Sequence, residues 1–313
     1  MPTILVTGAA GFIGSHTCDR LLENGHSVVG VDNFRTGRRE NLVPAGAHRT
    51  FRLVEADLTR PGLMNELVAE TRPEAIIHLA ALVSVQESIQ NPDLNFALNI
   101  ELTQRVAEAA RLHGVGRVVF ASSAAIYGDA AEMPIREDAE KRPISPYGAA
   151  KLASEAILLG HARAFGFIVR CQRYFNVFGP RQDPLSPYSG VISVFCNRLQ
   201  EGKTPTIFGD GEQTRDFISV YDVARANEIA ATAPGAASGV VNICTGRATT
   251  LNQLVGVLRT LIKNSPTPVY TDAKTADIRH SLGAAEAAKT ELGFTAGVTL
   301  VDGLAAILAQ KKS

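Results

Sequence analysis

The residues with the clearest chemical potential are Tyr147 and Lys151, which lie four positions apart just after Pro146. Pro146 favours the start of a helix, and residues 149–159 are rich in helix-forming types. Because residues four apart on a helix share a face, the Lys151 ammonium is expected beside the Tyr147 phenol. A neighbouring cation lowers the pKa of a phenol, which is otherwise about 10. The pair could therefore supply a phenolate base, although so short a pattern is more often an exposed Tyr-Lys pair.

A glycine-rich turn upstream changes how this pair is interpreted. Three glycines with the spacing GxxGxxG follow a strand-like run, residues 4–7, and open the first predicted helix. Glycine permits a tight turn, close approach of the backbone to a pyrophosphate, and close helix-strand packing. The helix N-terminus adds unpaired amides and a partial positive charge. The residues predicted to contact a dinucleotide here are Gly8, Gly11, Phe12, Ile13 and Gly14.

Asp32 ends the second predicted strand, eighteen residues after Gly14, where a carboxylate can accept both hydroxyls of a ribose. A ribose 2′-phosphate would meet this carboxylate at close range, so NAD is predicted as the cofactor rather than NADP. Arg35, Arg38 and Arg39 could hold a phosphate but are interpreted as exposed loop charges. An ordinary glycine loop and a solvated acid are the alternatives. The order of strand, glycines, helix, strand and acid argues against them.

Other cofactor contacts are expected where further strands end. Asp57 and Leu58 would lie near the adenine, and the small residues that follow His78 would let a ligand lie against the backbone. His78 itself is expected to be a packed strand residue. The remaining positions assigned to the cofactor are Asn33, Leu79, Ala80, Ala81 and Asn99. No metal site is predicted.

Apolar, β-branched runs alternate with helical patterns through the first half of the chain. The predicted strands are residues 4–7, 28–32, 51–57, 75–79, 118–122 and 168–173, and the predicted helices are 13–24, 63–70, 94–113 and 147–165. This alternation predicts an α/β fold, a Rossmann-type doubly wound parallel sheet buried on both faces. Loop signals increase after residue 176, and further helices are predicted at 190–200, 220–231, 251–263 and 284–292. We expect an NAD-binding domain at 1–175 and a smaller C-terminal lobe at 176–313, allowing for segments that return to the first domain.

The bulk composition excludes several classes of function. The net charge is zero and the pI is about 7.1, so no general attraction to nucleic acid or to an anionic membrane is expected. The four cysteines form no CxxC or metal-binding spacing and are interpreted as reduced thiols. No leader-like or membrane-spanning apolar run is seen. A cytoplasmic protein is expected.

Ser122 and Ser123 lie just past the fifth predicted strand, at the sheet edge where ligands of open α/β sheets bind. A hydroxyl there could bond the substrate group whose proton Tyr147 removes, or could merely cap or turn the chain. With the glycine turn and the Tyr147–Lys151 pair, this segment resembles the NAD-dependent epimerase/dehydratase family of extended short-chain dehydrogenases, particularly its UDP-glucose and UDP-N-acetylglucosamine 4-epimerase branch. The resemblance covers nearly the whole chain. It implies that Ser123, Tyr147 and Lys151 are catalytic.

The resemblance also implies substrate contacts in the second half. Phe175 would border the nicotinamide, residues 206–211 resemble a uridine-binding stretch, and Arg215 matches an arginine that grips the diphosphate. A guanidinium fork suits phosphate oxygens, whereas a surface ion pair with a nearby aspartate is the alternative. The implied substrate-binding residues are Ser84, Ser123, Asn176, Gln182, Thr206, Phe208, Arg215, Lys274 and Ser281.

The chain departs from the family pattern at one diphosphate contact. Lys274 stands where the family often carries an arginine, so Lys274 and Arg279 both stay open as the second clamp. Seven residues beyond Lys274, the family position that faces the sugar C2 substituent is Ser281 here. Its small side chain would leave room for an N-acetyl group, and Ser84 could bond the sugar or its amide.

The activity implied is reversible C4 epimerisation of UDP-hexoses with bound NAD, through a transient 4-keto intermediate. A sugar-nucleotide 4,6-dehydratase is one alternative, but its acid and base positions are Ala124 and Ala125 here, which cannot transfer protons. A non-catalytic NAD-binding regulator is another, and it would be expected to lose the catalytic residues. The helices predicted at 94–113 and 147–165 resemble those that pair across a homodimer. The expected partners are thus a UDP-sugar and a second copy of the chain.

Overall fold

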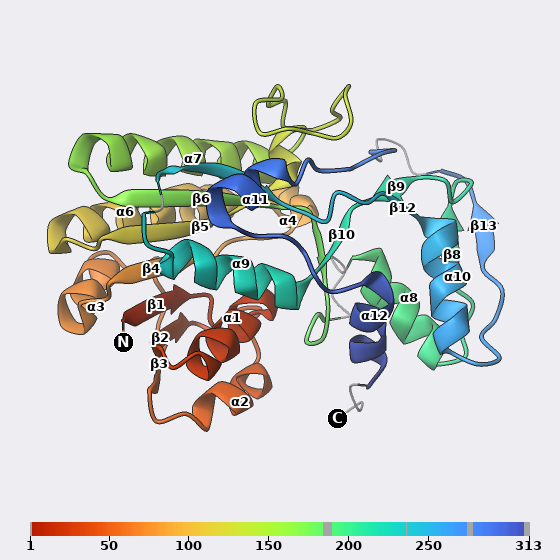
Figure 1. Cartoon of the computed structure of the whole chain (residues 1–313), viewed down its shortest axis with the longest axis horizontal. Helices are drawn as coiled ribbons and strands as arrows, with labels where there is room; N and C mark the ends of the chain where they lie inside the picture. The colour runs from red at the N-terminus through yellow and green to blue at the C-terminus, as the bar shows by residue number, and fades with distance from the viewer. Residues whose placement is uncertain (1, 184–189, 236, 274–277, 310–313) are drawn as a thin grey trace.

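A seven-stranded parallel sheet lies at the centre of the computed structural model, which describes residues 2–183, 190–235, 237–273 and 278–309 (Figure 1). The order across the sheet is β11-β6-β5-β4-β1-β2-β3, which reverses direction at β1 as doubly wound nucleotide-binding sheets do. Its strands are β1 (Thr3–Thr7), β2 (Ser27–Asp32), β3 (Phe51–Glu55), β4 (Ala75–His78), β5 (Arg117–Ser123), β6 (Ile168–Tyr174) and β11 (Gly239–Ile243). The predicted Rossmann-type fold is confirmed.

Burial explains the apolar composition of the central strands and one departure from it. Ile4, Leu5 and Val6 in β1 have no exposed surface, because helices cover both faces of the sheet. In β3, by contrast, Arg52 and Leu53 are exposed. This strand pairs only with β2 and forms one edge of the sheet, so less of its surface is covered. The strand predicted at 51–57 ends at Glu55.

Two helical layers enclose the sheet. One apolar core joins it to α1 (Phe12–Glu23), α2 (Val43–Gly46), α9 (Val220–Thr232) and α11 (Glu286–Leu292). The other joins it to α3 (Leu63–Thr71), α6 (Leu102–His113) and α7 (Pro146–Phe165). The helix that carries the Tyr-Lys pair begins as the sequence predicts, because Ser145 Oγ accepts from the amide of Gly148. It ends at Gly166, whose φ of 82° suits glycine.

The helix predicted at 94–113 consists of three successive pieces. They are α5 (Pro92–Asn95), a π-helical turn η2 (Phe96–Glu101) and α6, and a short helix α4 (Val85–Gln90) precedes them. The carbonyl oxygen of Asn99, inside the π turn, accepts hydroxyl hydrogen bonds from Thr103 and Ser154 at 2.6 and 2.9 Å. π-helical turns are often found at functional sites.

A smaller lobe with its own core lies at one end of the sheet (Figure 1). Its core includes Phe178, Ile207 and Leu254. The lobe contains β7 (Asn176–Phe178), α8 (Val191–Gln200), β8 (Thr206–Phe208), β9 (Thr214–Arg215), β10 (Phe217–Ser219), β12 (Thr249–Thr250), α10 (Leu251–Leu261), β13 (Val269–Thr271) and α12 (Leu300–Ala309).

The second half of the chain also contributes to the central sheet. Strand β11 pairs in parallel with β6, and α9 packs against α1. Sequence analysis did not predict β11, although the run at 239–243 is rich in β-branched residues. Among the described residues, no helix is long and apolar enough to cross a membrane. All four cysteines are free and buried.

Candidate active site

The glycine turn brings the N-terminus of α1 against the carboxyl ends of β1 and β4. Gly8 has φ +71°, and a Cβ there would lie 2.8 Å from the amide nitrogen of Ala80. A Cβ on Gly14 would lie only 2.0 Å from the carbonyl oxygen of Gly8. The N-cap of α1, Gly11, provides no side-chain cap, and Phe12 and Ile13 begin the helix. This close-packed turn with uncapped amides fits a dinucleotide pyrophosphate.

Asp32 is fixed beside this turn at the end of β2. Its two carboxylate oxygens accept hydrogen bonds from the amides of Ala10 and Phe34, each at 2.8 Å. A carboxylate has lone pairs beyond these two, so ribose hydroxyls can still be accepted. The arginines of the following loop are paired with carboxylates: Arg35 with Glu87, Arg38 with Asp183 and Arg39 with Glu55. This pairing favours NAD over a 2′-phosphorylated cofactor.

The neighbouring strand ends bring the other predicted cofactor residues to the same sheet edge. Asp57 accepts from the backbone amide and the hydroxyl of Thr59, and these bonds, with one from Asn33, lower its pKa. The amides of Leu79 and Ala80 donate to Thr7 Oγ1 at 3.2 and 3.1 Å. Leu58 is buried and Ala81 is partly buried.

His78 is a packed strand residue, as predicted. Its Nδ1 lies 2.8 Å from Thr7 Oγ1 and its Nε2 lies 3.3 Å from Thr103 Oγ1. Burial lowers the pKa of the imidazole to about 3, so the ring is neutral near pH 7.

Ser123, Tyr147 and Lys151 meet at the carboxyl end of β5. Ser123 hydrogen-bonds the Tyr147 side chain, and its Oγ also accepts from the amide of Ala125 at 3.2 Å. Lys151 Nζ lies 5.9 Å from the centroid of the Tyr147 ring and donates to the carbonyl oxygen of Ala121 at 2.8 Å. The structure thus brings together the hydroxyl, phenol and amine that the sequence assigned to catalysis.

Burial is the largest influence on the pKa values of Tyr147 and Lys151. It raises the pKa of Tyr147, which the hydrogen bond with Ser123 partly opposes. This direction is opposite to the lowering expected from the sequence. Burial also lowers the pKa of Lys151 to about 7, and the negative charge of Glu155 opposes that shift. Lys151 therefore changes its charge close to neutral pH.

Asn99 lies in the π turn η2, which packs against α7, the helix that carries Tyr147 and Lys151. Its Nδ2 donates to the carbonyl oxygen of Leu82 and to Asn95 Oδ1, at 3.0 and 2.7 Å. Its Oδ1 is buried and has no hydrogen-bond partner among the described residues. A buried acceptor of this kind is costly unless a ligand or water satisfies it, which agrees with a position close to the cofactor.

A cleft of about 370 Å³ is lined by residues of the smaller lobe, beginning with Asn176 just after β6. Its walls are largely apolar and include Phe178 and Phe217. Five of the predicted substrate residues line it: Asn176, Gln182, Thr206, Phe208 and Arg215. Gln213 and the first turn of α8, beginning at Gly190, also line it and were not predicted. Gly190, the N-cap of α8, has no side chain with which to cap the helix, and a helix N-terminus can bind an anion. In the sequence, Gly190 directly before the apolar helical pattern of residues 191–200 was the signal that could have indicated this anion site.

The segment that contains Ser281 connects this cleft to the catalytic end. The amide of Ser281 donates to the carbonyl oxygen of Thr214 at 3.2 Å, beside Arg215. Two residues on, a Cβ at Gly283 would lie 2.8 Å from the ring of Phe175. Ser281 therefore lies between the proposed diphosphate contact and the residue assigned to the nicotinamide.

Two other predicted substrate residues, Ser84 and Lys274, are not among the residues that line this cleft. Ser84 is buried, and its Oγ caps α4 by accepting from the amide of Glu87. Lys274 lies outside the described residues. Arg279, the alternative clamp, is exposed and donates to Asp210 at 2.7 Å, while its carbonyl oxygen accepts from Arg215.

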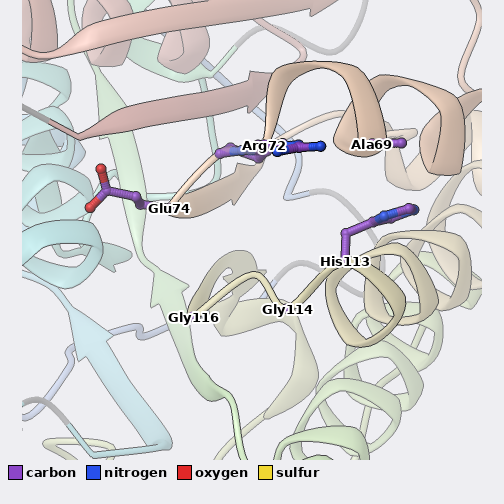
Figure 2. Close-up of a pocket in the computed structure, with 7 residues that line it drawn as sticks. Ala69, Arg72, Glu74, His113, Gly114 and Gly116 are labelled. Atoms are coloured by element: carbon purple, nitrogen blue, oxygen red, sulfur yellow. The ribbon is translucent and has the colours of Figure 1, made fainter.

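A second hollow, of about 710 Å³, lies at the amino-terminal ends of the strands, opposite the candidate site (Figure 2). It is lined by the residues that connect α3 to β4 and α6 to β5, among them Arg72, Glu74 and His113. Figure 2 shows the Glu74 carboxylate directed away from the other two side chains. Ligands of open α/β sheets bind at the carboxyl ends of strands, so this amino-terminal hollow is not the candidate active site.

The sheet order, the glycine turn, the acid after β2 and the Tyr-Lys pair define an NAD-binding enzyme fold of the short-chain dehydrogenase class. A family model, the NAD dependent epimerase/dehydratase family, matches residues 4–244. The chain belongs to this family. Its cofactor is NAD, which the turn and Asp32 fit.

Several proteins similar to this chain are 4-epimerases. A UDP-glucose 4-epimerase of Mycolicibacterium smegmatis is 39% identical over 302 residues, covering 96% of each chain. The crystal structure of UDP-glucose 4-epimerase from Thermotoga maritima with UDP-glucose is 39% identical, with a TM-score of 0.91 and coverage of 98% of this chain and 97% of that one. A UDP-N-acetylglucosamine 4-epimerase from Methanobrevibacter ruminantium, in complex with UDP-N-acetylmuramic acid, has 33% identity, a TM-score of 0.93 and the same coverage.

Proposed function

We propose that this protein is a UDP-sugar 4-epimerase that inverts C4 of UDP-hexoses reversibly through a transient 4-keto intermediate. The observation that carries this proposal is the meeting of Ser123, Tyr147 and Lys151 at the sheet edge, with the cleft of Asn176 and Arg215 nearby. The similar proteins named above act on this class of substrate by their names.

Each catalytic residue has a role in moving one proton. When bound, NAD supplies a hydride acceptor and donor together with a positively charged ring. Tyr147 removes the proton of the C4 hydroxyl and later returns it, as a general base and acid. Ser123, already bonded to the phenol, orients the reacting hydroxyl and shares its proton. The Lys151 ammonium stabilises the phenolate against the burial that disfavours it.

Inversion also requires that the UDP moiety stay anchored while the keto sugar turns. Arg215 suits a diphosphate, because its guanidinium offers several donors in a rigid fork. Asn176 and the amides at the start of α8 line the same cleft. We propose that residues 176–313 mainly hold the UDP-sugar and that residues 1–175 hold NAD.

The substrates proposed are UDP-glucose and UDP-galactose, together with their N-acetylated forms. Ser281 supports the wider range, because a small side chain beside the Arg215 strand leaves room at the sugar. Ser84 could bond the sugar or its amide through its hydroxyl hydrogen, since its oxygen already caps α4. One similar structure holds UDP-N-acetylmuramic acid, which agrees with an open site in this family.

Dehydration is the weaker alternative. It requires an acid and a base beside the intermediate, and the residues after Ser123 are Ala124 and Ala125, in a short 3-10 turn. A non-catalytic NAD-binding protein is weaker still, because all three proposed catalytic side chains are present and lie close together. We also propose a homodimer in a reducing, cytoplasmic setting, which suits four buried free thiols.

The test is incubation of the purified protein with UDP-glucose, UDP-galactose and their N-acetylated forms, followed by chromatographic separation of epimers. Conversion of either hexose pair is expected, and conversion of the N-acetylated pair would support the wider range. No conversion of any of the four would reject the proposal.

A further inference from the structure

A charged pair that the proposed mechanism does not use is buried one turn beyond Lys151. Glu155 on α7 and Arg173 on β6 are each 3% exposed. Arg173 Nε and Nη2 donate to the two carboxylate oxygens of Glu155 at 2.9 and 2.7 Å. An ion pair taken out of water gives little net stability, because desolvation offsets its attraction. Its position therefore calls for an explanation other than stability.

The pair connects the elements that carry the catalytic groups. Ser122 Oγ donates to Glu155, and Ser122 directly precedes Ser123. Ser122 also lies opposite Arg173 in the pairing of β5 with β6. Arg173 Nη1 donates in addition to the Tyr127 hydroxyl at 2.8 Å. The pair thus fixes α7 against β5 and β6 at the level of the catalytic residues.

Glu155 and Arg173 are also the charged side chains closest to the surroundings of Lys151. The titratable groups that face Lys151 or Glu155 are Tyr147 on α7, His78 on β4, Cys171 and Arg173 on β6, and Tyr127 after β5. Burial lowers the pKa of His78 to about 3 and raises the pKa values of the thiol and both phenols, so these four groups are neutral near pH 7. Among the described residues this leaves Glu155 and Arg173 as the charged neighbours, and Glu155 raises the pKa of Lys151.

We infer that Glu155, held in place by Arg173, is a positioning residue that keeps Lys151 protonated beside the Tyr147 base. The inference rests on the proposed function, since it assigns Glu155 a part in the same proton transfer. Glu155 touches neither substrate nor cofactor in this account and acts through Lys151.

The decisive variant is Glu155→Gln, which keeps the shape of the side chain and removes its charge. Loss of the carboxylate should lower the pKa of Lys151, because an attractive charge is gone and Arg173 is left unpaired. In lysine labelled at Cε with carbon-13, the NMR titration midpoint of Lys151 should fall by about one pH unit from a wild-type value close to 7. The resonance is identified by its loss in Lys151→Met. The alkaline limb of the kcat profile should move to lower pH in parallel, with KM little changed.

Glu291→Gln is the matched control. Glu291 pairs with Arg170, a buried arginine on the same strand β6, outside the groups that face Lys151. Its removal should leave the Lys151 midpoint at the wild-type value. If unpaired Arg173 prevents Glu155→Gln from folding, the double variant Glu155→Gln/Arg173→Gln removes both buried charges. Its Lys151 midpoint should still lie below the wild-type value, because the carboxylate that raises the pKa of Lys151 is gone, but the fall should be smaller, because Arg173 no longer repels the ammonium.

A folded Glu155→Gln protein with an unchanged Lys151 midpoint would overturn the inference and leave the epimerase proposal intact. Conversely, a wild-type protein that converts no UDP-hexose would reject the proposed function, while the NMR titration would still report on the coupling of Glu155 to Lys151. Glu155→Asp provides a rescue, because it keeps the charge and should retain the wild-type midpoint.

Discussion

At the scale of single residues, the chemistry depends on how the half-buried phenol of Tyr147 is made to ionise. Burial favours the neutral form of Tyr147, and the hydrogen bond with Ser123 favours the phenolate. In the proposed mechanism the positive charge of Lys151, whose Nζ lies 5.9 Å from the centre of the ring, also favours the phenolate. Because Lys151 has a pKa of about 7, its ammonium is present below that pH and is lost above it. The stabilisation of the phenolate should therefore weaken as the pH rises through the pKa of Lys151.

Substitution of Tyr147 by Phe tests the base directly. The ring and its packing remain while the ionisable oxygen is lost, so kcat should fall by about 10²–10⁴-fold, the usual contribution of general acid-base catalysis. The free energy of unfolding should change by no more than about 1.5 kcal/mol, because one hydrogen bond to Ser123 is lost. Epimerisation assays and denaturant unfolding measure both. Near-normal turnover in Tyr147→Phe would show that another group is the base.

The sequence predicted the relative positions of these residues where a motif and its spacing determine the geometry. Helical spacing put Lys151 beside Tyr147, and the strand-glycine-helix-strand order put Asp32 beside the turn. The direction of the Tyr147 pKa shift was wrong, because burial depends on residues far apart in sequence. Gln213 was missed for a similar reason, since only the folded lobe brings it to the cleft.

At the scale of elements, the first glycine turn is the most tightly constrained part of the site. A side chain at Gly14 would place Cβ 2.0 Å from a backbone oxygen, which cannot move without opening the turn. The elements themselves follow from local patterns, and boundaries agree within a few residues for most predicted helices. Strand β11 was not predicted, because its place in the sheet depends on β6, some seventy residues earlier, and not on local sequence.

Gly14→Ala should therefore abolish cofactor retention and destabilise the protein by about 1–3 kcal/mol, the usual cost of overpacking. Gly256→Ala is the control, since Gly256 is exposed in α10 and a Cβ there would meet nothing within 4 Å. That change should be neutral or stabilising by up to about 1 kcal/mol. Denaturant unfolding and the NAD content of the purified proteins measure the two effects. A Gly14→Ala protein that retains NAD normally would contradict the assignment of the turn.

At the scale of the whole molecule, one surface has the composition of an interface between copies. The outer face of α7 carries exposed small residues at helical spacing, Ala149, Ala156, Gly160 and Ala164. Exposed apolar side chains belong to α7 and to the neighbouring helical segments α4 and η2, namely Phe165, Ile89 and Phe96. Small residues permit close helix approach and large apolar ones favour burial, so this face suits the proposed two-fold dimer.

Light scattering at micromolar concentration should give twice the chain mass of 33.3 kDa. Ala156→Arg places a long cation in the middle of the α7 face and should shift the protein toward monomer. Ala305→Arg, at an exposed position of α12 away from this face, should leave the mass unchanged. A monomeric wild-type protein would contradict the assembly.

The central claim is that C4 is inverted by removal and return of the same hydride within one active site. It is tested by incubating the purified protein with UDP-galactose in heavy water, with no added NAD, and locating deuterium in the product by mass spectrometry and proton NMR. The account predicts UDP-glucose with no deuterium on any carbon, because the hydride never exchanges with solvent. Deuterium at a sugar carbon, or no UDP-glucose at all, would contradict it.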